Sequence, residues 1–297
     1  GRDEYERKTA EEVLLEEAEA AVGAKPEGEA IIVLDAKSLT DMLVSLDKGI
    51  KANETMRVKY SDPSKFMETE LDLHGAVQDL HAIAASPELY PVLLNHGSSL
   101  DNLLSLLGHD NTDIVVAVLE LFVEMSDISD DSPEADEQNV LSFCAQWVNA
   151  KGALESLVPS LGCYDWTLEE GGDISATTEK GVTTTLILLE NLLEVEKRAD
   201  GEEGVAPAVG STLLTKTDAL SALCGVFQKI KGFHPLKLHA SEVVSALLGH
   251  EATSSGESQA QALNIVEPLL QAQAGYRKKA PALGAEEEYY FNITLSL

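Results

Sequence analysis

The chain has 297 residues, of which 44% are hydrophobic, enough to bury a large core in one long solenoid or about two domains. Only 5% of the residues are aromatic, and 51 acidic against 21 basic residues give a net charge of −30. This charge repels phosphate backbones, so we expect no direct nucleic-acid binding, and it favours encounter with basic partners.

The cysteine and hydropathy patterns argue against further classes of protein. Cys144, Cys163 and Cys224 contain no close pair, so we expect neither a disulfide framework nor a cysteine metal site, as in a reducing compartment. No apolar run reaches about 18 residues, so we expect no membrane span. The start GRDEYERK lacks both a signal peptide and methionine, and we interpret it as processed or truncated.

Residues 1–37 are predicted to be an acidic N-terminal tail with one short helix, because Thr9 and Glu12 form a capping box. Helical repeats are predicted for residues 38–297. The first of their helices is expected to begin with Ser38 as its cap and to carry the apolar stripe of LTDMLVSLDKGI.

The next helix signal is SDPSKF, in which Asp62 can cap and Pro63 takes the first helical position. HDNTD, residues 109–113, predicts a turn that caps the apolar helix IVVAVLELFVEM. Acidic loops are expected at residues 126–136 and 165–174. About 12 short helices are expected in all, and no segment alternates with period two. The predicted fold is therefore all-α, an α-solenoid of stacked short helices.

One segment of the chain is repeated. LNHGSSLDNLLSLLG (94–108) and VNAKGALESLVPSLG (148–162) align without gaps, with leucines at helical spacing and a glycine at each end. LLTKTDALSALCGVF (213–227) is a weaker third copy. Such self-similarity is typical of stacked repeats. Pro159 lies inside the second copy, and we expect that helix to be kinked or to start late.

No catalytic or metal-binding constellation is found in the sequence. The seven histidines form no HExxH pair, and neither GxSxG nor GxxxxGK occurs. The triplets GHD and GHE, at Gly108 and Gly249, each follow a predicted helix end, so we interpret them as turns. The acidic pairs lie in loops without an apolar pocket to tune them. We therefore predict no catalytic residue, no metal and no cofactor.

A binding surface is the remaining prediction. If the repeated helices stack, polar positions between their buried leucines recur along one concave surface, where carboxylates can hold the Lys and Arg side chains of a peptide. The alternative is an ordinary solvated helix face. The predicted peptide-binding residues are Asp101, Asn102, Ser105, Glu155, Ser156 and Asp218.

The last residues, AEEEYYFNITLSL, carry Tyr289, Tyr290, Phe291, Ile293, Leu295 and Leu297 on nearly every side of a predicted helix. A solenoid normally ends in a repeat with a polar outer face. We interpret this end as an artificial boundary or a contact surface, and we expect homo-oligomers to form through it.

RVKYSDPSKFMETELDLHGAVQDLHAIAASPELYPVLL and LLGHDNTDIVVAVLELFVEMSDI resemble the family of beta-catenin-like proteins, which are armadillo-like and spliceosome-associated. KFMETELDL and LLGHDNTD are the specific parts, and SEVVSALL (241–248) is the clearest later match. The family's GHDN motif matches His109, Asp110 and Asn111. The chain stops before the family's remaining repeats, so residues 38–297 are interpreted as C-terminally truncated.

The resemblance implies an armadillo/HEAT-like α-solenoid and a non-catalytic nuclear scaffold that takes part in pre-mRNA splicing within the nineteen complex. Its implied partners are basic, nuclear-localisation-like segments of splicing proteins, including the Myb-like core subunit of that complex, and a cytidine deaminase. Alternatives stay open: a generic α-solenoid adaptor or transport-type receptor outside splicing, or a regulator or enzyme whose site is assembled from distant residues. A row of Asp, Glu and Asn favours the scaffold, and a closed apolar pocket with convergent polar groups favours the regulator or enzyme.

Overall fold

The computed structural model describes residues 34–129, 132–150, 152–167, 174–199, 207–254 and 256–297. Every regular element among them is a helix, which confirms the all-α prediction. The short helix predicted at Thr9 lies outside the described residues. None of the described helices combines the length and the apolar character that crossing a membrane requires.

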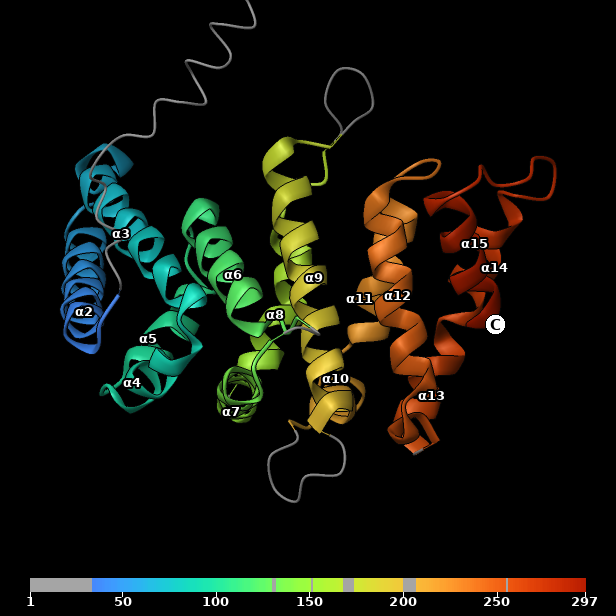
Figure 1. Ribbon diagram of the computed structural model, residues 1–297. Helices are drawn as coiled ribbons and strands as arrows, with labels where there is room; N and C mark the ends of the chain where they lie inside the picture. Colours follow the sequence, from blue (N-terminus) through green and yellow to red (C-terminus); the bar gives the residue numbers. More distant parts are fainter. Residues whose placement is uncertain (1–33, 130–131, 151, 168–173, 200–206, 255) are drawn as a thin grey trace, which may run out of the picture. The chain divides into compact units, whose positions relative to one another are not determined.

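The unit Asp35–Leu297 is built from three-helix repeats (Figure 1). A helix pair comes first, α2 (Ala36–Lys59) and α3 (Met67–Leu80), and short 3-10 helices flank α3 at Pro63–Lys65, His81–Ala85 and Pro87–Leu89. The first two repeats are α4 (Tyr90–Asn95), α5 (Ser99–Leu106) and α6 (Thr112–Ser126), then α7 (Glu134–Asn149), α8 (Ala153–Cys163) and α9 (Ala176–Ala199). The next two are α10 (Val209–Lys216), α11 (Ala219–Lys229) and α12 (Pro235–Gly249), then, after a 3-10 turn at Glu251–Ser254, α13 (Gly256–Asn264), α14 (Val266–Ala274) and α15 (Ala285–Leu295).

Equivalent helices of successive repeats pack on one another. The third helices of the repeats continue a series of contacts that α3 begins: α3 on α6, α6 on α9, α9 on α12 and α12 on α15. We call these five helices the third-helix row. The second helices α8, α11 and α14 also contact in order. The three sequence copies prove to be the second helices α5, α8 and α11, so the repeat read from the sequence is the structural repeat.

The stripes expected on the second helices are buried where their neighbours cover them. In α8, Leu154, Leu157, Val158 and Leu161 are all buried, and in α11 Leu220, Leu223, Cys224 and Phe227 are. In α5 Leu103 and Leu106 are buried, as is Leu107 directly after the helix, whereas Leu100 and Leu104 are half-buried. Helix α6 is apolar on nearly every side because it packs against α3, α5, α7 and α9.

Helix ends differ from the sequence prediction in three places. Helix α2 begins at Ala36 rather than Ser38, because the Asp35 side chain accepts a hydrogen bond from the Ser38 backbone N–H at 2.7 Å. Helix α8 begins at Ala153, directly after Gly152, whose φ is +82°, so Pro159 does not delay its start. Gly162 lies within the last turn of α8 and is no left-handed cap. Asp62 and Asn111 cap as expected, accepting from the backbone N–H groups of Ser64 and Asp113.

Candidate peptide-binding surface

The residues predicted to bind a peptide lie on the second helices of three successive repeats. Asp101, Ser105 and Ser156 are exposed, Asn102 and Glu155 are half-buried, and Asp218 is exposed directly before α11. None of the six lies on the third-helix row. The structure thus confirms that they come from equivalent helices, and their role in binding stays a prediction.

Several of these polar groups already have partners within the fold. Asn102 Nδ2 donates to Asp47 Oδ1 on α2 at 2.6 Å, and this contact ties α5 to the first helix pair. The hydroxyls of Ser105 and Ser156 donate to backbone carbonyls one turn earlier, those of Asn102 and Gly152, each at 2.7 Å. The carboxylates of Asp101, Glu155 and Asp218 are therefore the predicted groups that remain best suited to meet a basic partner.

The third-helix row carries a hollow that the sequence did not indicate. A cavity of about 630 Å³ spans α3, α6 and α9, three successive helices of that row. Glu70, Asp113 and Glu120 supply carboxylates to its lining, and the side chains of Met67 and Leu71 beside them are largely exposed. A surface that combines carboxylates with exposed aliphatic groups matches a lysine or arginine side chain, which has a charged head on an apolar stem.

Carboxylates continue along the row beyond this cavity. Glu190 on α9 and Glu242 on α12 converge on His239, whose Nδ1 lies 3.0 Å from Glu190 Oε1 and 3.5 Å from Glu242 Oε2. Burial is the largest cause, and the charge of Glu190 the second, of a rise in the pKa of Glu242 from its ordinary 4.5 to about 7. Glu288 on α15 adds to this shift. Negative charge from three consecutive third helices is therefore concentrated at one place.

Glu190, His239 and Glu242 are also the one group of metal-ligand type within the described residues, with one ligand atom from each and all three atoms within 4.8 Å of one another. The hydrogen bond to Glu190 raises the pKa of His239, because its effect is larger than that of burial, which lowers the pKa. His239 and Glu190 therefore form an ion pair in which each neutralises the other. We assign the cluster to charge balance between α9 and α12 rather than to a metal.

Histidines join successive layers of the stack. His81 Nδ1 lies 2.8 Å from Glu124 Oε2 on α6, and its Nε2 lies 3.2 Å from the Ala117 carbonyl oxygen. His250 Nε2, at the end of α12, lies 3.6 Å from Glu196 Oε2 on α9. Sequence reasoning missed these contacts because their partners are 36 or more residues apart, and no local spacing indicates them.

The GHD and GHE triplets are turns, as predicted. His109 Nδ1 accepts from the Asn111 backbone N–H at 3.0 Å, and His250 Nδ1 accepts from the Ala252 backbone N–H at 3.1 Å. The same turn fastens the first repeat to α2 and α3. His109 Nε2 contacts Asn53 Oδ1 at 3.1 Å, and Asp110 pairs with Arg57.

Asn111 completes that junction, since its Nδ2 donates to Glu70 Oε2 at 3.0 Å, while Arg57 pairs with Glu70 Oε1 at 2.5 Å. Because His109, Asp110 and Asn111 each bind a residue of the first helix pair, GHDN has a structural role at this interface. It also positions Glu70 at the edge of the third-helix cavity.

Comparison with known proteins gives consistent matches. A family model described as catenin-beta-like, Arm-motif containing nuclear, matches residues 16–297. Beta-catenin-like protein 1 of Mus musculus is 30% identical over 264 residues, which cover 88% of this chain and 42% of the mouse protein. The Homo sapiens protein of that name is 30% identical over 265 residues, 89% of this chain and 43% of the human protein.

A more distant relative is the beta-catenin-like protein 1 homolog of Schizosaccharomyces pombe. It is 28% identical over 262 residues, which cover 88% of this chain and 42% of the yeast protein. The chain therefore spans less than half the length of the curated relatives it matches.

Proposed function

Because the chain belongs to the catenin-beta-like family of nuclear proteins that contain the armadillo motif, we propose that it is a non-catalytic nuclear scaffold. Its role is to bind basic, nuclear-localisation-like segments of splicing factors. Within this proposal it takes part in pre-mRNA splicing in the nineteen complex, and the Myb-like core subunit of that complex is one of its partners.

The observation that carries the proposal is the series of carboxylates along the third-helix row. Glu70, Asp113 and Glu120 line the cavity over α3, α6 and α9, and Glu190 and Glu242 extend the acidic surface to α12. Two of the cavity's carboxylates already have a cation partner, since Arg57 pairs with Glu70 and Lys180 lies 2.8 Å from Glu120. An extended basic segment laid across the row would meet one carboxylate group after another.

Each such contact is weak by itself. An exposed ion pair contributes roughly 0–1 kcal/mol and is screened by salt, so specific capture needs several contacts acting together. The chain's net charge of −30 also accelerates the encounter with a basic segment wherever the segment finally binds. Affinity must therefore be compared between surfaces at equal net charge.

Two double variants make that comparison. Asp113→Lys with Glu120→Lys changes the third-helix row, and Asp101→Lys with Glu155→Lys changes the second helices by the same four charge units (two units for each Asp or Glu replaced by Lys). Fluorescence anisotropy with a Lys/Arg-rich peptide should give strong, salt-dependent binding to the wild type. We expect the third-row variant to lose at least ten-fold in affinity and the second-helix variant to lose less.

The opposite ranking would assign binding to the second helices, where Asp101 and Glu155 lie. Equal binding by wild type and both variants would refute peptide capture by either surface. The splicing part of the proposal is tested separately, by recovering the chain from nuclear extract and identifying its partners by mass spectrometry. Recovery without any nineteen-complex subunit would contradict it.

A further inference from the structure

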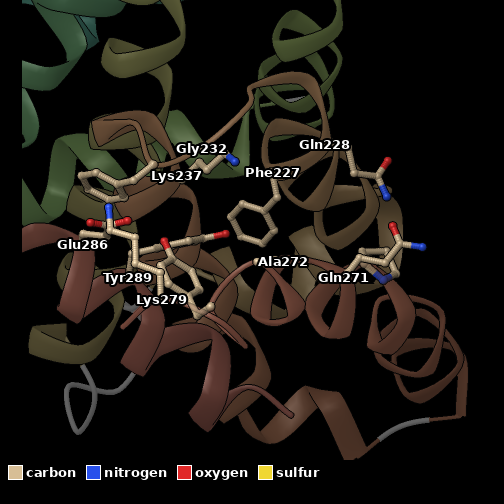
Figure 2. Close-up of a pocket in the computed structure, with 13 residues that line it drawn as sticks. Phe227, Gln228, Gly232, Lys237, Gln271, Ala272, Lys279, Glu286 and Tyr289 are labelled. Carbon is tan, nitrogen blue, oxygen red and sulfur yellow. The ribbon is translucent and has the colours of Figure 1, made fainter. Parts of the chain in front are cut away.

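A second cavity, of about 720 Å³, lies between α11, α12, α14 and α15, far along the chain from the acidic cavity (Figure 2). Phe227 reaches it from α11, Phe233 from the loop before α12, Tyr276 from the end of α14 and Tyr289 from α15. Gly232, with φ at +71°, makes the turn that brings Phe233 to the cavity.

Tyr289 is the centre of this aromatic wall. Its ring is 2% exposed, and the ring centroids of Phe227, Phe233 and Tyr276 lie 5.7, 6.0 and 6.3 Å from it at tilted or edge-on angles. Tyr289 and Phe227 are themselves buried, and they hold in place the half-buried rings of Phe233 and Tyr276, which supply the apolar surface open to the cavity. The wall is therefore suited to the body of a planar ligand.

Lys237 is the unusual member of the lining. Its residue is only 7% exposed, and its ammonium has no hydrogen-bond or ion-pair partner among the described residues. Burial lowers its pKa below the ordinary 10.5. The ammonium lines the cavity without a partner from the described part of the chain, so an anion bound there would supply one.

The position of Lys237 in its helix strengthens this argument. It is the third residue of α12, whose first turn holds no acidic residue. A helix N-terminus carries partial positive charge, so a lysine there adds charge of the same sign. The nearby carboxylate of Glu286 is already engaged, since its Oε2 accepts from the Ala282 backbone N–H at 2.9 Å and its charge acts on Tyr276.

We propose that this cavity is a binding site for a small planar anion, an aryl carboxylate or aryl phosphate. The anionic group binds the ammonium of Lys237, and the ring lies against the wall formed around Tyr289. The site is independent of peptide capture on the third-helix row, because it uses neither the carboxylates of that row nor a basic partner.

The test is calorimetric titration of the full chain with four probes: benzoate, phenyl phosphate, neutral benzamide and inorganic phosphate. We expect benzoate or phenyl phosphate to bind at least ten-fold more tightly than both benzamide and inorganic phosphate. The tighter of the two aryl anions identifies the anionic group. Benzamide binding as tightly as benzoate would overturn the role of Lys237, and inorganic phosphate binding as tightly as phenyl phosphate would overturn that of the aromatic wall.

Lys237→Met keeps the apolar stem of the side chain and removes its charge. The matched control is Lys231→Met, which removes the charge of an exposed lysine. We expect the Lys237 variant to lose at least ten-fold in affinity for the aryl anion and the control to lose none. A second readout uses the wild type alone. The bound anion should protect Lys237 from acylation, measured by mass spectrometry, whereas benzamide should not. Undiminished binding by the Lys237 variant, or no protection, would refute the site.

Discussion

His239 Nδ1 on α12 lies 3.0 Å from Glu190 Oε1 on α9, so that one side-chain contact joins the third helices of two successive repeats. Glu242, one turn further along α12, faces the same histidine. The two acids share one cation, and the pKa of Glu242 rises to about 7 through burial and the neighbouring charge of Glu190.

This cluster predicts that stability falls as pH rises through neutrality. The folded state holds the Glu242 proton more tightly than the unfolded state, so its contribution is full below about pH 4.5 and is lost by about pH 7. The pKa of His239 is raised, so the contribution of its contact with Glu190 is full below 6.5 and is lost as the pH passes the higher folded value.

Glu242→Gln removes the loss of stability that comes from deprotonation of Glu242. We expect the variant to match the wild type near pH 5 and to be more stable at pH 8 by roughly 1 kcal/mol, a figure reduced for the partial exposure of the group. Urea denaturation at the two pH values measures the difference. Glu54→Gln, at an exposed position on α2, is the control and should change neither value. A Glu242 variant no more stable than wild type at pH 8 would contradict the cluster's assigned electrostatics.

Gly181 on α9 predicts a steric effect. A Cβ built there would overlap the ring of Tyr164, which is itself buried and has little room to move. We expect Gly181→Ala to destabilise the fold by about 1–3 kcal/mol through overpacking. Gly75, inside α3, has open space around it, so Gly75→Ala should stabilise by about 0.5–1 kcal/mol. Thermal denaturation of both variants tests the pair, and two changes of the same sign would refute this packing.

Helix α15 predicts self-association. Tyr289 and Ile293 are buried, so the preceding helices α12 and α14 cover part of this apolar segment. Phe291, Leu295 and Leu297 are still 62%, 69% and 46% exposed. Burying each would contribute roughly 1.5–3 kcal/mol before the costs of association.

Light scattering tests this surface. We expect the wild-type chain to form dimers or larger species and Phe291→Asp with Leu295→Asp to be monomeric. Leu283→Asp, which changes a still more exposed leucine outside α15, should associate as the wild type does. A monomeric wild type at high concentration would show that these side chains do not mediate association.

The buried thiols predict low chemical reactivity. Burial raises the pKa of both Cys144 and Cys224 to about 12, so almost no thiolate forms near neutral pH. In a Cys163→Ser background, a disulfide reagent should label neither thiol of the native protein and both after denaturation. Rapid labelling of the native protein would mean that the helices covering these residues open readily.

The sequence alone determined the class of fold and its repeating unit. Leucines at helical spacing in residues 94–108, 148–162 and 213–227 identified three equivalent helices, because each helix must bury its own stripe whatever it packs against. Caps such as Asp62 and Asn111 were predictable for the same reason, since a cap bonds to backbone within three residues of itself.

Only the tertiary structure decided which helices make surfaces. The copies are second helices, whereas the acidic cavity belongs to the third helices, which show no obvious sequence repeat. The contacts of His81 with Glu124 and of His239 with Glu190 join residues more than 40 positions apart, and nothing local specifies them. The same holds for Lys237, because a lysine in a helix's first turn looks solvated until helices from later in the chain close over it. Local hydrogen bonds and apolar periodicity are determined by short segments of the sequence. Burial and the clustering of charges depend on packing between segments that are distant in the sequence.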